Sequence, residues 1–148
     1  MTETVWKALP QAALRNRLLD LTAGKGTLQI YNPMEGVLVS RADGHMELAL
    51  AEQWARVTEP LWARGARLTV FNDWERMSTY DSGARKLLTD WVLSHRAQMD
   101  CAWFCTSSRI VAMGVAAAGA LTALAGVSMH ASTDRAQFER ELRKRLGQ

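Results

Sequence analysis

The sequence of 148 residues contains little cysteine and little proline, and no low-complexity tract divides it. Its two cysteines, Cys101 and Cys105, are four residues apart, which on one strand separates the side chains by roughly 13 Å, too far for a disulfide. The three histidines are scattered, so no Cys/His set has the spacing of a zinc site. We predict two buried thiols on a core strand, a reducing compartment, and no metal or other cofactor.

The motifs of the common enzyme classes are also missing. The sequence has no glycine-rich phosphate loop, no Gly-x-Ser-x-Gly elbow and no His-Glu-x-x-His pair. Asp73 and Glu75 are close in sequence, but we expect this acidic pair to be solvated on a loop, and His130 has no nucleophile to pair with. The sequence therefore favours a protein that is not an enzyme, with no catalytic residues.

Charge and hydrophobicity argue against nucleic acid and membrane as partners. The net charge of +3 is mild, and the basic cluster at 140–145 is typical of the solvated face of a terminal helix. No signal peptide is visible, so we expect a cytoplasmic protein. The uncharged run at 110–129 has the length of a membrane span but is rich in alanine and glycine, which gain little from lipid. We interpret it as a small-residue helix followed by a buried strand.

Hydrophobic periodicity predicts an α/β fold. Residues 27–31 and 37–39 alternate like strands around turn-forming residues, so they predict a hairpin that is closed at 42–44. Apolar residues at helical spacing predict a helix over 45–64, with a kink or an early end near Pro60. Further strands are predicted at 66–71, 99–105 and 127–131, a polar loop at 72–82, and helices at 83–95, from 109 to about 118, and from 132 onward.

This order predicts one domain over 27–148, preceded by a lead-in at 1–26 that is irregular or forms a short helix or strand. The domain is a mixed sheet of about five strands, with an N-terminal hairpin followed by alternating helices and parallel strands, and about four helices. Trp54 and Trp62 fall on or near the apolar face of the first helix, and we expect them in the core.

Hydroxyl-rich segments at 72–83 and 106–109 follow two of the predicted strands. Because the carboxyl ends of parallel strands share one edge of a sheet, we expect the two segments to adjoin where helix starts favour negative charge. Asp81 or Ser82 could cap the second helix, and Ser107 or Ser108 the third. The residues predicted for a partner-binding surface are Asp73, Ser78, Thr79, Tyr80, Asp81, Gly83, Ser107 and Ser108.

The strand Leu68-Thr-Val-Phe71, its polar loop and the Asp81-Ser82-Gly83 turn into a helix resemble the STAS domain of bacterial anti-sigma factor antagonists, the SpoIIAA-like family. In that family a partner kinase phosphorylates a serine at the start of this helix, which switches binding to the anti-sigma factor. The resemblance implies a non-catalytic regulatory module with Ser82 as the phospho-switch. The family pattern is Asp-Ser-Ser-Gly followed by leucine, whereas this chain has one serine before Gly83 and an alanine after it.

The element order from residue 27 onward, with the stretch at 106–114, also resembles divergent STAS-like proteins, some of which are grouped with the CRAL-TRIO lipid-transfer domains. Three functions stay open. The first is a regulatory module with a protein partner, such as an anti-sigma-like kinase, and with a homodimer as one possible state. The second is a carrier of a lipid or small apolar ligand, since small residues at 114–119 could leave room beside the sheet. The third is membrane attachment through 110–129.

Overall fold

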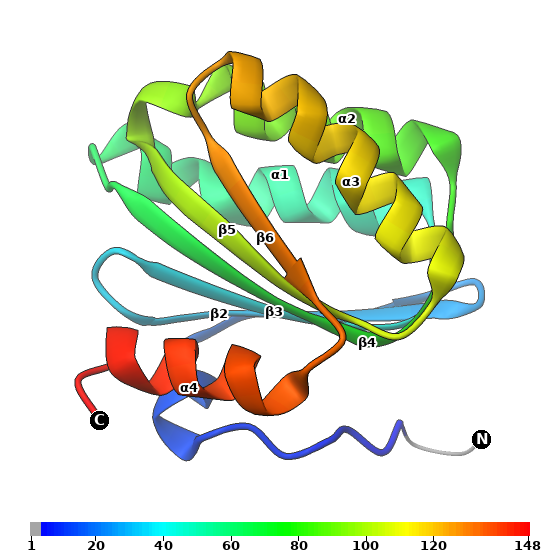
Figure 1. Ribbon diagram of the computed structural model, residues 1–148, viewed down its shortest axis with the longest axis horizontal. Helices are drawn as coiled ribbons and strands as arrows, with labels where there is room; N and C mark the ends of the chain where they lie inside the picture. Colours follow the sequence, from blue (N-terminus) through cyan, green and yellow to red (C-terminus); the bar gives the residue numbers. More distant parts are fainter. Residues whose placement is uncertain (1–3) are drawn as a thin grey trace.

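The computed structural model describes residues 4–148, which form a six-stranded sheet with helices on both faces (Figure 1). The first three strands are antiparallel neighbours, and the third to the sixth run parallel. The sheet order follows the chain: β1 (Arg17–Ala23), β2 (Gly26–Met34), β3 (Val37–Met46), β4 (Leu68–Tyr80), β5 (Met99–Thr106) and β6 (Ser128–Ser132). The predicted mixed sheet is confirmed, with six strands in place of about five.

Helices divide unequally between the two faces of the sheet (Figure 1). One face, here called the α1–α3 face, carries α1 (Leu48–Ala63), α2 (Ser82–Ser94) and α3 (Arg109–Leu124). The other, the α4 face, carries α4 (Arg135–Arg145) and the N-terminal segment with the 3₁₀ turn η1 (Gln11–Leu14). A second 3₁₀ turn, η2 (Arg96–Gln98), leads into β5. Trp54 and Trp62 lie in the core of the α1–α3 face, as predicted, with exposures of 2% and 5%.

The N-terminal lead-in contributes an edge strand. β1 pairs antiparallel with β2 through a two-residue turn, in which Gly24 has a φ of 57°, a conformation that favours glycine. Leu19 and Leu21 of this strand pack against the core of the α1–α3 face. Residues 17–23 of the segment whose form the sequence left open are thus a strand of the sheet.

The turn predicted at 42–44 is wrong, because Gly44 allows two strands to approach closely. β3 continues to Met46, and Gly44 pairs with Gly26 of β2. A Cβ on Gly26 would lie 1.9 Å from the carbonyl oxygen of His45, so a side chain there would collide with backbone. α1 accordingly begins at residue 48 rather than 45, and it continues past Pro60 to Ala63, close to the predicted bound of 64. Of the two alternatives at Pro60, a kink or an early end, the early end is therefore wrong.

The polar loop predicted at 72–82 is mostly strand. β4 extends to Tyr80 because its parallel pairing with β3 continues as far as Met46↔Tyr80. Asn72 is 2% exposed, and its side-chain oxygen accepts a hydrogen bond from the Ser40 hydroxyl at 2.7 Å. A buried polar side chain with a partner gives the same signal in sequence as a solvated loop residue, which explains the error.

The uncharged run at 110–129 divides into most of α3, a turn and the first residues of β6. α3 ends at Leu124 rather than near 118, and β6 is an edge strand whose side chains are largely exposed, so its predicted burial is wrong. Within residues 4–148, every helix is too short or too polar to traverse a bilayer. α4 begins at residue 135, and the side chain of Asp134 caps it by accepting from the Gln137 amide.

Candidate functional site

The two hydroxyl-rich segments lie side by side at the carboxyl ends of β4 and β5. The Ser107 hydroxyl donates to the carbonyl oxygen of Glu75 at 2.6 Å, and the Ser108 hydroxyl donates to that of Ser78 at 2.9 Å. The Ser108 oxygen also accepts from the Val111 amide at 3.3 Å, so it caps α3 as predicted. The starts of α2 and α3 therefore belong to one edge of the molecule, on the right of Figure 1. We call residues 78–83, 107 and 108 the rim.

His45, at the end of β3, joins three elements at the rim. Its Nδ1 lies 2.5 Å from the Thr79 hydroxyl, and its Nε2 lies 2.8 Å from Oδ1 of Asp81. The other carboxylate oxygen of Asp81 accepts from the Leu48 amide at 2.8 Å. The hydrogen bond with His45, followed by that from Leu48, lowers the pKa of Asp81. Asp81 stands at the N-cap position of α2, but its side chain is bonded to the start of α1 instead.

Among the described residues, α2 is consequently the one α-helix whose first turn has no side-chain acceptor. Ser82 is its first residue and is exposed. The free N–H groups of a first turn carry partial positive charge and favour an anion. The predicted capping of α2 by Asp81 or Ser82 is thus wrong, and the start of this helix remains available to an external group.

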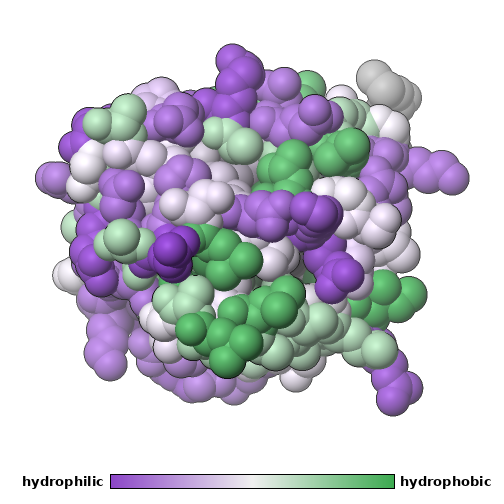
Figure 2. Space-filling model, turned by 90° about the horizontal axis from the view of Figure 1, so that it is seen from above, coloured by the Kyte–Doolittle hydropathy of each residue, from purple (hydrophilic) through white to green (hydrophobic). Residues whose placement is uncertain are grey.

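Apolar side chains flank the rim. Leu48, Ile110 and Met113 expose 41%, 53% and 66% of their surface. Figure 2, which looks down on the α1–α3 face, shows hydrophobic groups gathered in patches between hydrophilic ones. Tyr80 instead packs on α3, where a Cβ on Gly114 would lie only 2.6 Å from the tyrosine oxygen. Gly83 packs beside Leu48, at ordinary contact distance for an added Cβ.

Asp73 does not belong to the rim. It is 5% exposed on the α4 face, where both terminal nitrogens of Arg135 bind its carboxylate at 2.8 and 2.9 Å. Arg135 Nη1 also lies 2.8 Å from Glu75, which Lys7 approaches to 2.5 Å. Burial alone would raise the pKa of Glu75, but Lys7 and Arg135 outweigh it and lower that pKa. The predicted solvated acidic pair is wrong, since both carboxylates are ion-paired. We call Lys7, Asp73, Glu75 and Arg135 the ionic network.

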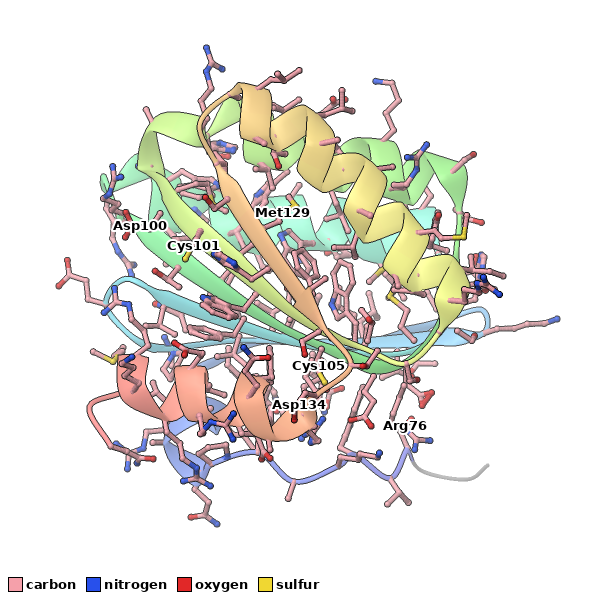
Figure 3. The ribbon with its side chains drawn as sticks, in the orientation of Figure 1. Arg76, Asp100, Cys101, Cys105, Met129 and Asp134 are labelled. Atoms are coloured by element: carbon pink, nitrogen blue, oxygen red, sulfur yellow. The ribbon has the colours of Figure 1, made fainter. Side chains whose placement is uncertain are left out.

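The two cysteines are free thiols at opposite ends of β5, as Figure 3 shows. Cys105 is buried near the start of α4, and burial, followed by the charges of Asp73 and Glu75, raises its pKa to about 11. Cys101 is half-buried, and burial raises its pKa as well. Burial is therefore complete for one of the two thiols, and both are protonated near neutral pH.

Two groups of side chains place atoms of metal-ligating types within 4.8 Å of one another. One consists of Asp73, Glu75 and Cys105, but Arg135 neutralises both carboxylates there. The other consists of His45, Glu47 and Asp81. Here His45 bonds to Asp81, which also accepts from the Leu48 amide, and Glu47 accepts from the Lys25 amide. The contacts of both groups account for their side chains without a metal ion.

The fold is similar to that of several solved structures, whereas no protein-family model and no curated protein matches the sequence. An uncharacterized DUF3478 protein with a SpoIIAA-like fold from Shewanella loihica has a TM-score of 0.59 and 12% identity, over 79% of this chain and 94% of its own. The anti-sigma factor antagonist SpoIIAA in its unphosphorylated form has a TM-score of 0.53 and 19% identity, over 76% of this chain and 96% of its own. The Bacillus cell fate determinant SpoIIAA in its phosphorylated form has a TM-score of 0.55 and 19% identity, over 76% and 97%. The chain therefore has the STAS, SpoIIAA-like fold that its sequence predicts.

Proposed function

We propose that this protein is a non-catalytic, cytoplasmic regulatory module that binds a partner protein through the rim, and that phosphorylation of Ser82 switches this binding. The observation that carries the proposal is the exposed hydroxyl of Ser82 on the one described α-helix whose first turn has no side-chain acceptor. The similar fold of SpoIIAA, an anti-sigma factor antagonist known in unphosphorylated and phosphorylated forms, supports it.

A phosphoryl group suits this position for a physical reason. It adds nearly two negative charges, and the free N–H groups and dipole of a helix start stabilise such an anion. The other three α-helices of the described residues already have carboxylate or hydroxyl oxygens at their starts, from Asp81, Ser108 and Asp134. Of these four positions, only the start of α2 is thus open to an added phosphate.

The surroundings of Ser82 suit a protein partner. Interfaces between proteins combine apolar contacts at their centre with polar groups at their margin. Leu48 and Ile110 provide exposed apolar area next to the hydroxyl and amide groups of the rim. A phosphate on Ser82 would place charge beside these apolar side chains and repel an acidic or apolar partner surface. The partner would be a kinase or another regulator.

Affinity capture with four forms of the protein tests the proposal: wild type, Ser82→Ala, Ser82→Asp and Ser128→Asp. Ser128 is an exposed serine at the start of β6, at the opposite end of the parallel strands from the rim, so it controls for added charge. We expect the wild type, Ser82→Ala and Ser128→Asp to retain the same partner, and Ser82→Asp to capture about tenfold less of it or none. We also expect protein isolated from cells to contain phosphoserine at position 82. Partners indifferent to both changes at Ser82 would remove the switch from the account.

A further inference from the structure

A cavity lies on the α1–α3 face, between the sheet and the pair of helices α2 and α3. Its volume is about 70 Å³, counted as the space that the centre of a water molecule can reach. Protein interiors are close-packed, and voids larger than one water molecule are few. This space is several times larger than one water needs, so it calls for an explanation beyond imperfect packing.

The lining of the cavity is aromatic and adaptable. Trp74 and Phe104 meet edge to face with ring centres 5.0 Å apart, as do Trp54 and Trp91 at 5.5 Å. Methionines complete the wall, and their flexible thioethers adjust to irregular ligands; they are Met46, Met77, Met99 and Met129. Figure 3 shows the last of these on β6, at the edge of the sheet. Such a lining suits an apolar body.

One buried donor in the wall has no acceptor. Trp54 is 2% exposed and lines the cavity, and its Nε1–H bonds to no acceptor within the described part of the chain. The indole of Trp91, by contrast, donates to the Thr58 hydroxyl at 2.9 Å. A buried donor without a partner costs free energy, so this wall is not packed for stability alone. The Nε1–H of Trp62, outside the cavity lining, is unpaired as well.

A cationic side chain that lines the cavity indicates which polar group the ligand carries. Arg85, which is exposed on α2, is the cation among the residues that line the cavity. The ion pairs of the described residues do not include Arg85. A guanidinium binds a carboxylate through two parallel hydrogen bonds, which favours an acidic group on the ligand.

We infer that the cavity binds an amphiphilic carboxylic acid, such as a medium-chain fatty acid, with its apolar body among the indoles and its carboxylate at Arg85. This inference does not depend on Ser82 or on the partner of the rim. It assigns α2 and α3 a role in holding a small molecule, because both helices line the cavity.

Quenching of tryptophan fluorescence by ω-bromodecanoate, below its micelle concentration, tests this directly, because three indoles line the cavity. Ala118 lines the cavity, whereas its neighbour Ala117 lies exposed on the outside of α3. Ala118→Leu should fill part of the cavity and weaken binding about tenfold or more, and Ala117→Leu should leave it unchanged. Arg85→Gln should weaken decanoate about three- to tenfold without affecting the neutral analogue decanol.

Each result decides a part of the inference. Saturable quenching that is lost in Ala118→Leu but kept in Ala117→Leu supports the cavity as the site. Absence of quenching in the wild type, or equal quenching in both alanine variants, overturns it. Equal affinity for decanol and decanoate, unchanged in Arg85→Gln, overturns the acidic group. Melting curves identify a variant that fails to fold, and the wild-type comparison of the two ligands then still decides.

Discussion

The two faces of the sheet both bury an apolar cluster but differ in how their buried polar groups are satisfied. On the α4 face, charged groups from the N-terminal segment, β4 and α4 bind one another. The single side chain of Arg135 contacts Asp73, Glu75 and the carbonyl oxygen of Ala8. On the α1–α3 face, the core is almost entirely apolar, yet it contains a cavity and the unpaired Nε1–H of Trp54. The α4 face also buries an apolar cluster, which includes Phe71, Phe138 and Leu142, and it has an open groove beside α4. The difference is that the buried charges of the α4 face are paired, whereas the α1–α3 face leaves a donor unpaired in the wall of an apolar cavity.

The difference bears on which mutations should act on stability and which on the proposed binding. The charged groups of the ionic network are already paired with one another and have no hydrogen-bonding capacity left for a ligand. Their role is therefore to join segments that are distant in sequence. A cavity and an uncapped helix start have the opposite property, since both leave contacts unmade. We therefore propose that binding takes place at the α1–α3 face and its rim, and we expect mutations on the α4 face to act on stability.

The largest expected effect comes from breaking the ionic network. Arg135→Ala leaves the carboxylate of Asp73, only 6% exposed, without its cation, and should lower the free energy of unfolding by about 2–4 kcal/mol. Urea denaturation measures this. Arg143→Ala removes an exposed arginine from the same helix and should change stability by less than about 0.5 kcal/mol. Equal effects of the two changes would show that the α4 face is not held by its charges.

A pair of substitutions on β5 compares the packing of the two faces on one strand. Ala102 lines the cavity, and Cys105 is fully buried on the α4 face. Ala102→Val should enter free space and change the unfolding free energy by less than about 1 kcal/mol, whereas Cys105→Leu should lower it by about 1–3 kcal/mol through overpacking. Thermal unfolding followed by circular dichroism measures both. A larger loss in Ala102→Val would mean that the cavity does not tolerate added volume.

The order of elements could be predicted from the sequence because it depends on local periodicity. The helix predicted at 83–95 is observed at Ser82–Ser94, and the strand predicted at 99–105 is observed at Met99–Thr106. The adjacency of the two hydroxyl-rich segments was also predictable, because parallel strands end at one edge. These successes required no knowledge of distant contacts.

The errors concern polar residues whose partners are distant in sequence. Asn72 and Asp73 have the composition of a loop, but Ser40 and Arg135 satisfy them from 32 and 62 residues away. His45 was missed for the same reason: its contacts with Thr79 and Asp81 follow from the register of β3 against β4, which no local pattern encodes. The cavity depends on how three helices pack and gave no sequence signal beyond the small residues of α3.

The smallest expected effect concerns the contacts of Asp81 at the rim, which pH can weaken. Because the folded state lowers the pKa of Asp81, its ionised carboxylate contributes stability above the usual aspartate range of about pH 4, and this is lost as pH falls through the lowered pKa. Asp81→Asn should therefore be less stable than the wild type near about pH 6, and the difference should shrink toward about pH 2. His45→Gln, which removes the larger cause of the shift, should show a weaker pH dependence than the wild type. Urea titrations at several pH values measure this. A stability difference between wild type and Asp81→Asn that stays constant with pH would contradict this prediction. It would mean that His45 and Leu48 do not stabilise the charged form of Asp81.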